Sequence, residues 1–189
     1  MIGRSGLVAM ILLAFVSASR AETAQWMSPG PAIPAVTLLD ENGQDQPLAD
    51  LVGDRPVLVG FFFTGCATIC PLQTATMQAV QGELATRHLA NMATPLLLSI
   101  SLDPIGDTPS SVRAYAAQFG IQLGRDHDWL MLSGSARMLA PVWASFEEEG
   151  PISDHSGFLW IGQPDNQRWT RVNAMSDAGQ IADLLLEKP

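Results

Sequence analysis

Two continuous apolar runs of strand length constrain the fold of this chain most tightly. They span residues 56–63 (Pro-Val-Leu-Val-Gly-Phe-Phe-Phe) and 95–101 (Pro-Leu-Leu-Leu-Ser-Ile-Ser). Strands without polar alternation are typical of a sheet that is covered on both faces. Residues 71–88 between them carry apolar side chains at helical spacing, and Thr108-Pro109 begins a further helix that Gly120 ends. This alternation predicts an α/β fold with a parallel sheet at its core.

Weaker patterns complete the predicted architecture. Residues 36–39 form a short strand, and the Asn-Gly pair within residues 40–43 predicts a hairpin turn after it. Residues 48–53 are interpreted as a turn. The remaining patterns predict strands at 129–132, 157–162 and 168–173 and helices over 135–144 and 177–186. The sequence contains no internal repeat and no sign of a second domain.

The first 21 residues are typical of an export signal. Arg4 supplies positive charge, residues 7–16 are apolar, and Ser19-Arg20-Ala21 offers small residues at both positions of a cleavage site. The apolar run is about half of the ~20 residues that a membrane-spanning helix needs. We therefore expect a signal peptide over residues 1–21, with an uncleaved membrane anchor as the alternative. Residues 22–35, rich in proline, are predicted to form an extended leader before a domain over 36–189.

Charge and size exclude some classes of function. Cleavage after residue 21 would leave 8 basic against 19 acidic residues, a formal charge of −11 compared with −9 for the whole chain. Such an acidic protein is unsuited to binding nucleic acid. A chain of 189 residues buries enough surface to fold without a metal or disulfide staple. The two cysteines are therefore available for chemistry.

Cys66 and Cys70 lie between the first apolar run and the helix that follows it. On a first helical turn such residues share one face, with Cα atoms roughly 6 Å apart, which suits either a disulfide or two thiolates on one metal ion. The helix N-terminus favours the thiolate over the thiol. A disulfide across so short a loop would contribute little stability. Ordinary buried cysteines are the alternative interpretation.

His155, in Asp154-His155-Ser156, is the candidate third ligand. Two thiolates and an imidazole make a soft set that suits Cu(I) and also admits Cu(II), whereas structural zinc usually has four protein ligands. Asp154 is a candidate to orient the imidazole ring. A hydrogen-bonded structural histidine is the alternative. His88 and His127 lie among charged residues and are left out of the predicted site.

Other residues that can carry chemistry have simpler interpretations. Four methionines in apolar patterns lack the clustered M-x-x-M spacing of a methionine copper site, so we expect them, like the five tryptophans, to pack in the core: Met77, Met92, Met131 and Met138. Glutamates 147–149 predict a solvated loop. The threonine spacing before Cys66 does not fit a peroxidase signature.

Three segments together resemble the Sco/SenC family of thioredoxin-fold copper proteins. They are residues 63–71 (F-T-G-C-A-T-I-C-P), 101–109 (S-L-D-P-I-G-D-T-P) and 154–156 (D-H-S), in that order. The resemblance extends from about Pro34 to Leu186. It implies a single thioredoxin-like domain, with a central mixed β-sheet flanked by helices and an N-terminal β-hairpin.

The resemblance also implies a function and a location. Cys66, Cys70 and His155 match the copper ligands of the family, and the implied role is copper delivery to the CuA centre of cytochrome c oxidase in the bacterial periplasm. The expected partner is the copper-bearing oxidase subunit or another periplasmic copper or thiol protein. Membrane contact is expected only through that partner or an uncleaved N-terminal segment. The chain departs from the family at Gly65, where many members have a polar residue, and in a shorter connection before His155.

Two further functions stay open for the dithiol. In a thiol–disulfide oxidoreductase, Cys66 and Cys70 would be the catalytic pair, because one thiolate attacks a partner disulfide and the other resolves the mixed disulfide. In a redox or copper sensor, the same pair would change state and signal to a partner. The C-x-x-x-C spacing, in place of the C-x-x-C of thioredoxin-type reductases, favours metal binding over an enzymatic role.

Overall fold

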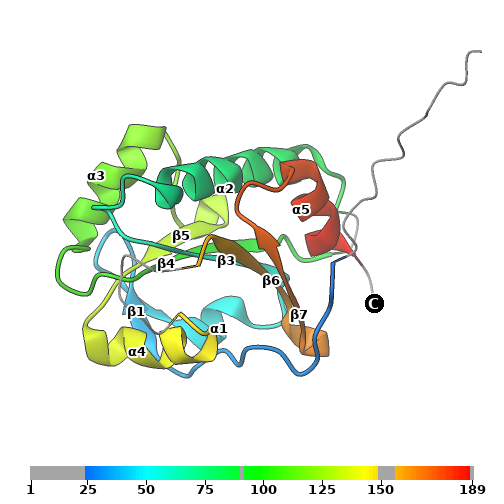
Figure 1. Cartoon of the computed structure of the whole chain (residues 1–189), viewed down its shortest axis with the longest axis horizontal. Helices are drawn as coiled ribbons and strands as arrows, with labels where there is room; N and C mark the ends of the chain where they lie inside the picture. The colour runs from blue at the N-terminus through cyan, green and yellow to red at the C-terminus, as the bar shows by residue number, and fades with distance from the viewer. Residues whose placement is uncertain (1–23, 90–91, 149–155, 188–189) are drawn as a thin grey trace, which may run out of the picture.

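The structure is a computed structural model that describes residues 24–89, 92–148 and 156–187. Within these residues the main sheet has five strands, in the order β5-β4-β3-β6-β7 (Figure 1). The strands are β3 (Val57–Phe62), β4 (Leu96–Ser101), β5 (Trp129–Leu132), β6 (Phe158–Gln163) and β7 (Arg168–Asn173). β3, β4 and β5 run parallel, whereas β6 is antiparallel to β3 and to β7. The predicted mixed α/β sheet is confirmed.

Helices cover both faces of this sheet (Figure 1). One face carries α2 (Ile69–Thr86), α3 (Pro109–Phe119) and α5 (Ala178–Leu186), and the other carries α1 (Leu48–Val52) and α4 (Ala136–Ser145). Thr108 caps α3 by accepting the N–H of Ser111, and Gly120 ends it at φ 64°. Both ends of α3 therefore lie where the sequence predicts them.

Coverage on both faces explains why the central strands lack polar alternation. Val57, Val59 and Phe61 pack in the cluster beneath α1 and α4, while Leu58 faces the cluster of α2 and α5. Every residue of β3 and of β4 is buried. The predicted core role holds for Trp129, Trp160, Trp169, Met77 and Met131, which are all buried. The other residues of that prediction are only partly buried, namely Trp26, Trp143, Met92 and Met138.

A hairpin precedes the sheet, as predicted. It consists of β1 (Thr37–Leu39) and β2 (Asp45–Pro47), with Gly43 at φ 76° in the turn. The prediction of a turn over residues 48–53 is wrong, because this segment forms the short helix α1. Its apolar residues Leu48, Leu51 and Val52 are spaced to enter the core together, and that burial stabilises a helix too short to form alone.

The proline-rich segment before the hairpin packs along β7. Met27 and Trp169 exchange two backbone hydrogen bonds, at 2.7 and 3.0 Å. A Cβ atom at Gly30 would collide with the Trp169 ring, so only glycine fits this close approach. Two single turns of 3₁₀ helix, η1 (Arg125–His127) and η3 (Pro164–Asn166), complete the described elements. Among the described residues, no helix combines the length and the apolar character needed to cross a membrane.

Candidate metal centre

The two cysteines lie in the loop that joins β3 to α2 and in the first turn of that helix. α2 begins at Ile69, so Cys70 is helical, while Cys66 precedes the helix. The prediction that both lie on one helical turn is therefore wrong for Cys66. The reason is local, because the Cys66 N–H donates to Phe63 O at 3.0 Å in a tight turn, and Thr68 has non-helical angles of φ −117° and ψ −90°.

This loop turns the Cys66 sulfur back onto the start of the helix. Cys66 Sγ accepts the backbone N–H of Cys70 at 3.4 Å and lies 3.7 Å from Thr68 Oγ1. The Cys70 thiol also forms a side-chain hydrogen bond with Cys66. Cys70 is fully buried, and Cys66 is 7% exposed. The two sulfurs are thus neighbours, with Cys66 on the outer side.

Burial controls the chemistry of Cys70. It raises the pKa of the Cys70 thiol to about 12, together with a smaller contribution from the hydrogen bond with Cys66. The prediction that the helix N-terminus favours the thiolate is therefore wrong for Cys70, because loss of hydration penalises the charged form more than the helix dipole stabilises it. A metal ion that binds Cys70 must displace its proton.

The two cysteines pack in one hydrophobic cluster with the aromatic rings of Phe62 and Tyr115. These two rings stack with centroids 5.7 Å apart. The Tyr115 hydroxyl and Thr74 Oγ1 hydrogen-bond at 2.9 Å, which ties α3 to α2. Burial, with smaller contributions from the neighbouring cysteines, raises the pKa of Tyr115 to about 12. The dithiol therefore rests on a dry surface that excludes water from its inner side.

Asp107 anchors the cysteine loop to the end of β4. This carboxylate is only 4% exposed. Its Oδ1 accepts the Thr64 N–H at 2.8 Å and the Thr64 hydroxyl at 2.7 Å, and its Oδ2 accepts the Ser101 hydroxyl at 2.6 Å. The D-P-x-x-D-T-P segment, which lies within the second motif of the family resemblance, therefore holds the residues that lead into Cys66.

Gln73 is a site-supporting residue that the sequence analysis missed. It is 2% exposed on α2 and faces β3 at a point beyond Val59, where the pairing of β3 with β6 has ended. Its amide donates to Phe61 O and accepts the Phe61 N–H, both at 3.0 Å. The available signal is Gly60, since any larger residue there would collide with the Gln73 side chain.

His155 and Asp154 fall outside the described residues, and the described chain resumes at Ser156. Gly157 packs on the first turn of α2, because a Cβ built there would lie 3.3 Å from Ile69 Cγ1. The segment that follows His155 in sequence therefore reaches the helix beside Cys70. In the described part of the chain, no three His, Cys, Asp or Glu side chains converge as a metal site would require.

The glutamate run before this segment is only partly solvated. The Glu147 side chain is 78% exposed, as predicted. The prediction is wrong for Glu148, which is 8% exposed. The backbone N–H of Ser156 donates to Glu148 Oε2 at 3.1 Å, and the Ser156 hydroxyl donates to Oε1. The carboxylate is buried because it has these two donors.

The two other histidines lie apart from the cysteines. His88 is exposed beyond the C-terminal end of α2, whereas Cys70 is at its N-terminal end. His127 is exposed in η1, and its carbonyl accepts a hydrogen bond from Gln81 in the middle of α2. Their predicted exclusion from the site agrees with these positions.

The comparison with known families identifies the chain. The SCO1/SenC family model matches residues 29–187. The chain belongs to the SCO1/SenC family. A candidate copper-binding protein of Stutzerimonas stutzeri is 31% identical to it over 146 residues, which cover 76% of this chain and 70% of that protein. The family predicted from the three motifs is confirmed.

Solved structures of SCO1/SenC family members share the fold. Bradyrhizobium japonicum ScoI with copper bound aligns with a TM-score of 0.64 and 23% identity, covering 81% of this chain and 96% of that one. BsSco, described as a member of the Sco family of cytochrome c oxidase assembly proteins with a disulfide switch, aligns with a TM-score of 0.63 and 24% identity over 84% and 96% of the two chains. These likenesses confirm the predicted thioredoxin-like fold. Copper, the metal predicted from the ligand types, is the metal bound in ScoI.

Proposed function

We propose that this protein binds one copper ion through Cys66, Cys70 and His155 and delivers it during the assembly of cytochrome c oxidase. The observation that carries the proposal is the conformation of the C-x-x-x-C loop. It sets Cys66 Sγ 3.4 Å from the Cys70 backbone nitrogen and keeps both sulfurs at one end of α2. Two neighbouring thiols are the donors that Cu(I) prefers.

The position of Gly157 supports His155 as the third ligand. Gly157 contacts Ile69, the residue next to Cys70. His155 comes two residues earlier, and two residues of extended chain span at most about 7 Å. An imidazole attached there is within reach of a metal ion held by the two sulfurs. We propose Asp154 as the group that orients this ring from outside the ligand set.

Copper is the cargo of this site, so release matters as much as binding. The high pKa of Cys70 means that its thiol recovers a proton when copper leaves. This proton competes with the metal, so it weakens the apparent affinity at neutral pH. Cys66, the less buried sulfur, is the natural ligand to exchange first with a donor of the receiving protein. The site thus combines specific donors with a route for transfer.

The proposed partner is the copper-bearing subunit of cytochrome c oxidase, and the proposed location is the periplasm. The relation to BsSco supports the partner, because that protein is described within a family of cytochrome c oxidase assembly proteins. The signal-like residues 1–21 support the location. Cleavage there would leave the leader over 22–35 attached to the domain over 36–189.

An anaerobic Cu(I) titration of the reduced protein against a competing chelator tests the ligand set. We expect one copper per chain, loss of binding in Cys66→Ser and Cys70→Ser, and affinity at least about 10-fold weaker in His155→Ala. His127→Ala is the matched control, because it removes an exposed histidine and should change nothing. Unaltered affinity in His155→Ala would exclude the three-ligand site.

The oxidoreductase function is less favoured than copper binding. A dithiol oxidoreductase needs a second thiolate to resolve the mixed disulfide, and burial raises the pKa of Cys70, the less exposed cysteine that would supply it. A copper sensor would use the same metal site with another partner, whereas a redox sensor would use the change of Cys66 and Cys70 between dithiol and disulfide. Transfer of bound copper to the isolated oxidase domain, followed by the copper spectrum of the acceptor, distinguishes delivery from sensing.

A further inference from the structure

Glu148 and Ser156 are the described residues on either side of the segment 149–155, and two hydrogen bonds join them. The Glu148 carboxylate accepts the Ser156 N–H at 3.1 Å on one oxygen and the Ser156 hydroxyl on the other. The N–H of Ser156 belongs to the peptide group that links it to His155. The carboxylate therefore holds the backbone directly attached to the proposed ligand.

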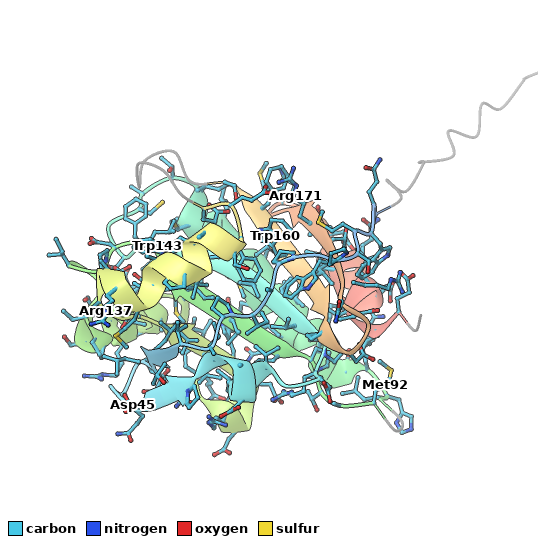
Figure 2. All side chains as sticks on the ribbon, turned by 90° about the horizontal axis from the view of Figure 1, so that it is seen from below. Asp45, Met92, Arg137, Trp143, Trp160 and Arg171 are labelled. Atoms are coloured by element: carbon cyan, nitrogen blue, oxygen red, sulfur yellow. The ribbon has the colours of Figure 1, made fainter. Side chains whose placement is uncertain are left out.

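Both sides of this contact are fixed to the rest of the fold. The Glu148 N–H donates to Trp143 O at 2.9 Å, and Trp143 Nε1 donates to Ser101 O at the end of β4 at the same distance. Trp143 of α4 and Trp160 of β6, both labelled in Figure 2, pack in the hydrophobic cluster on the face of the sheet that α4 covers. Glu147, the residue before Glu148, adopts φ 58°, in the left-handed region. The backbone that carries the Glu148 carboxylate is therefore hydrogen-bonded to α4, and α4 is hydrogen-bonded to β4.

Ser156 is held equally firmly on its other side. Gly157, the next residue, packs on Ile69, and its carbonyl accepts the Ala174 N–H at 2.8 Å. Hydrogen bonds to an ionised acceptor are stronger than neutral ones, and a buried carboxylate without donors would be costly. The pair thus ties Glu148 to Ser156, whose neighbour Gly157 packs on the first turn of α2.

We propose that Glu148 is a positioning residue that acts on copper binding through Ser156 and His155. This inference rests on the proposed function, in which His155 is a copper ligand. Groups that orient a ligand from outside the coordination sphere typically contribute about 10- to 100-fold in metal affinity. Holding both ends of the segment also reduces the conformational entropy that His155 would lose when copper binds.

The test measures Cu(I) affinity by chelator competition in wild type, Glu148→Ala, Glu148→Gln and Ser156→Ala, each with and without His155→Ala. We expect Glu148→Ala to weaken binding about 10-fold in the presence of His155 and by less than about 2-fold in its absence. Ser156→Thr keeps the hydroxyl and should retain near wild-type affinity. Glu147→Gln is the matched control, since it removes an adjacent exposed charge and should have no effect.

A spectroscopic readout separates positioning from general stability. In the Cu(II)-loaded protein, the nitrogen coupling from imidazole should decrease in Glu148→Ala and persist in Glu147→Gln.

Equal weakening of Cu(I) binding with and without His155 would overturn the proposal, because Glu148 would then act on the whole fold. An effect of His155→Ala without any effect of Glu148→Ala would overturn the positioning role alone. If His155→Ala itself has no effect, the ligand set fails and the positioning role fails with it. If Glu148→Ala does not fold, Glu148→Gln and Ser156→Ala carry the same comparison.

Discussion

The Cys70 thiol is fully buried and has a pKa near 12, whereas an unperturbed cysteine has a pKa of about 8.5. Because the raised pKa favours the thiol, the reactive thiolate is scarce between pH 7 and 10. In the reduced, metal-free protein, we expect iodoacetamide to modify Cys66 well before Cys70. In Cys66→Ser, the rate at Cys70 should rise about 10-fold per pH unit without a plateau up to pH 10. Mass spectrometry of timed samples measures both rates.

The same variant in urea supplies the control for Cys70. In the unfolded chain the thiol is hydrated, so its alkylation rate should level off above about pH 8.5. A plateau near that pH in the folded protein would show that the helix N-terminus outweighs burial. Stability follows the same sign, because the folded state holds this proton more tightly than the unfolded state. The stability contributed by Cys70 is therefore present below about pH 8.5 and is lost as the pH rises toward 12.

Asp107 is the second residue with a specific expected effect. Asp107→Ala removes the acceptor for the Thr64 N–H and for the hydroxyls of Thr64 and Ser101. Losing a buried charged acceptor should lower the free energy of unfolding by about 3 kcal/mol, and the released loop should weaken Cu(I) binding. Urea unfolding and copper competition measure the two effects. Asp103→Ala, in the same loop, is the control for stability alone, because among the described residues the Asp103 side chain accepts only the local Ile105 and Gly106 N–H groups. Wild-type copper affinity in Asp107→Ala would contradict an anchoring role.

The sequence predicted which side chains are candidate metal ligands better than it predicted the residues that surround them. Cys66 and Cys70 stand out because the chain contains no other cysteine. Gln73 and Glu148 are not rare residue types in this chain, so their identity does not single them out. Their partners Phe61 and Ser156 come from segments brought close only by the tertiary fold. The ionisation of Cys70 was mispredicted for the same reason, because burial depends on α3 packing against the helix start.

At the scale of elements, Gln73 joins α2 to β3 at the point where the pairing of β3 with β6 stops. Gln73→Leu keeps the volume similar but leaves the buried N–H and C=O of Phe61 without this partner. Each unsatisfied buried group costs about 1–3 kcal/mol, so we expect a loss of about 2–4 kcal/mol in the free energy of unfolding. Urea unfolding of the metal-free protein measures this loss.

Gln81→Leu is the matched control on the same helix. Its amide bonds an exposed carbonyl, that of His127, so the change should stay within about 0.5 kcal/mol. Equal stability of the two variants would show that water or a shifted backbone satisfies Phe61. Because α2 also carries Cys70, weaker copper binding in Gln73→Leu alone would place the helix anchor within the support of the site.

Element prediction succeeded where burial on both faces dictated the pattern and failed where an element was short. β3, β4 and β5 were found because apolar runs of that length have few alternatives. α1 was missed because five residues give too little periodicity, and its helix depends on contacts made elsewhere. α2 begins at Ile69 and not at Pro71, since a proline in the first helical turn needs no N–H partner and does not mark the first residue.

At the scale of the whole molecule, the alternation of strands and helices was sufficient to predict an α/β fold with a parallel core. The antiparallel partners β6 and β7 required the family resemblance, because single-strand patterns do not specify direction. The packing of residues 24–35 along β7 could not be predicted, since an extended proline-rich segment looks the same whether it is bound or solvated. That packing leads to a last prediction.

A chain that starts at Ile33 should be less stable than one that starts at Glu22. The truncation removes the two backbone hydrogen bonds between Met27 and Trp169 and uncovers the Trp169 ring against which Gly30 packs. Two hydrogen bonds and partial exposure of one tryptophan together amount to about 2–4 kcal/mol, which urea unfolding followed by tryptophan fluorescence measures. Trp26→Ala in the longer chain should cost less than the truncation, about 1–2 kcal/mol, because it loses the packing of a partly buried ring against the core and the stacking with Arg168. Equal stability of the long and short chains would mean that the segment is held too weakly to count as part of the folded domain.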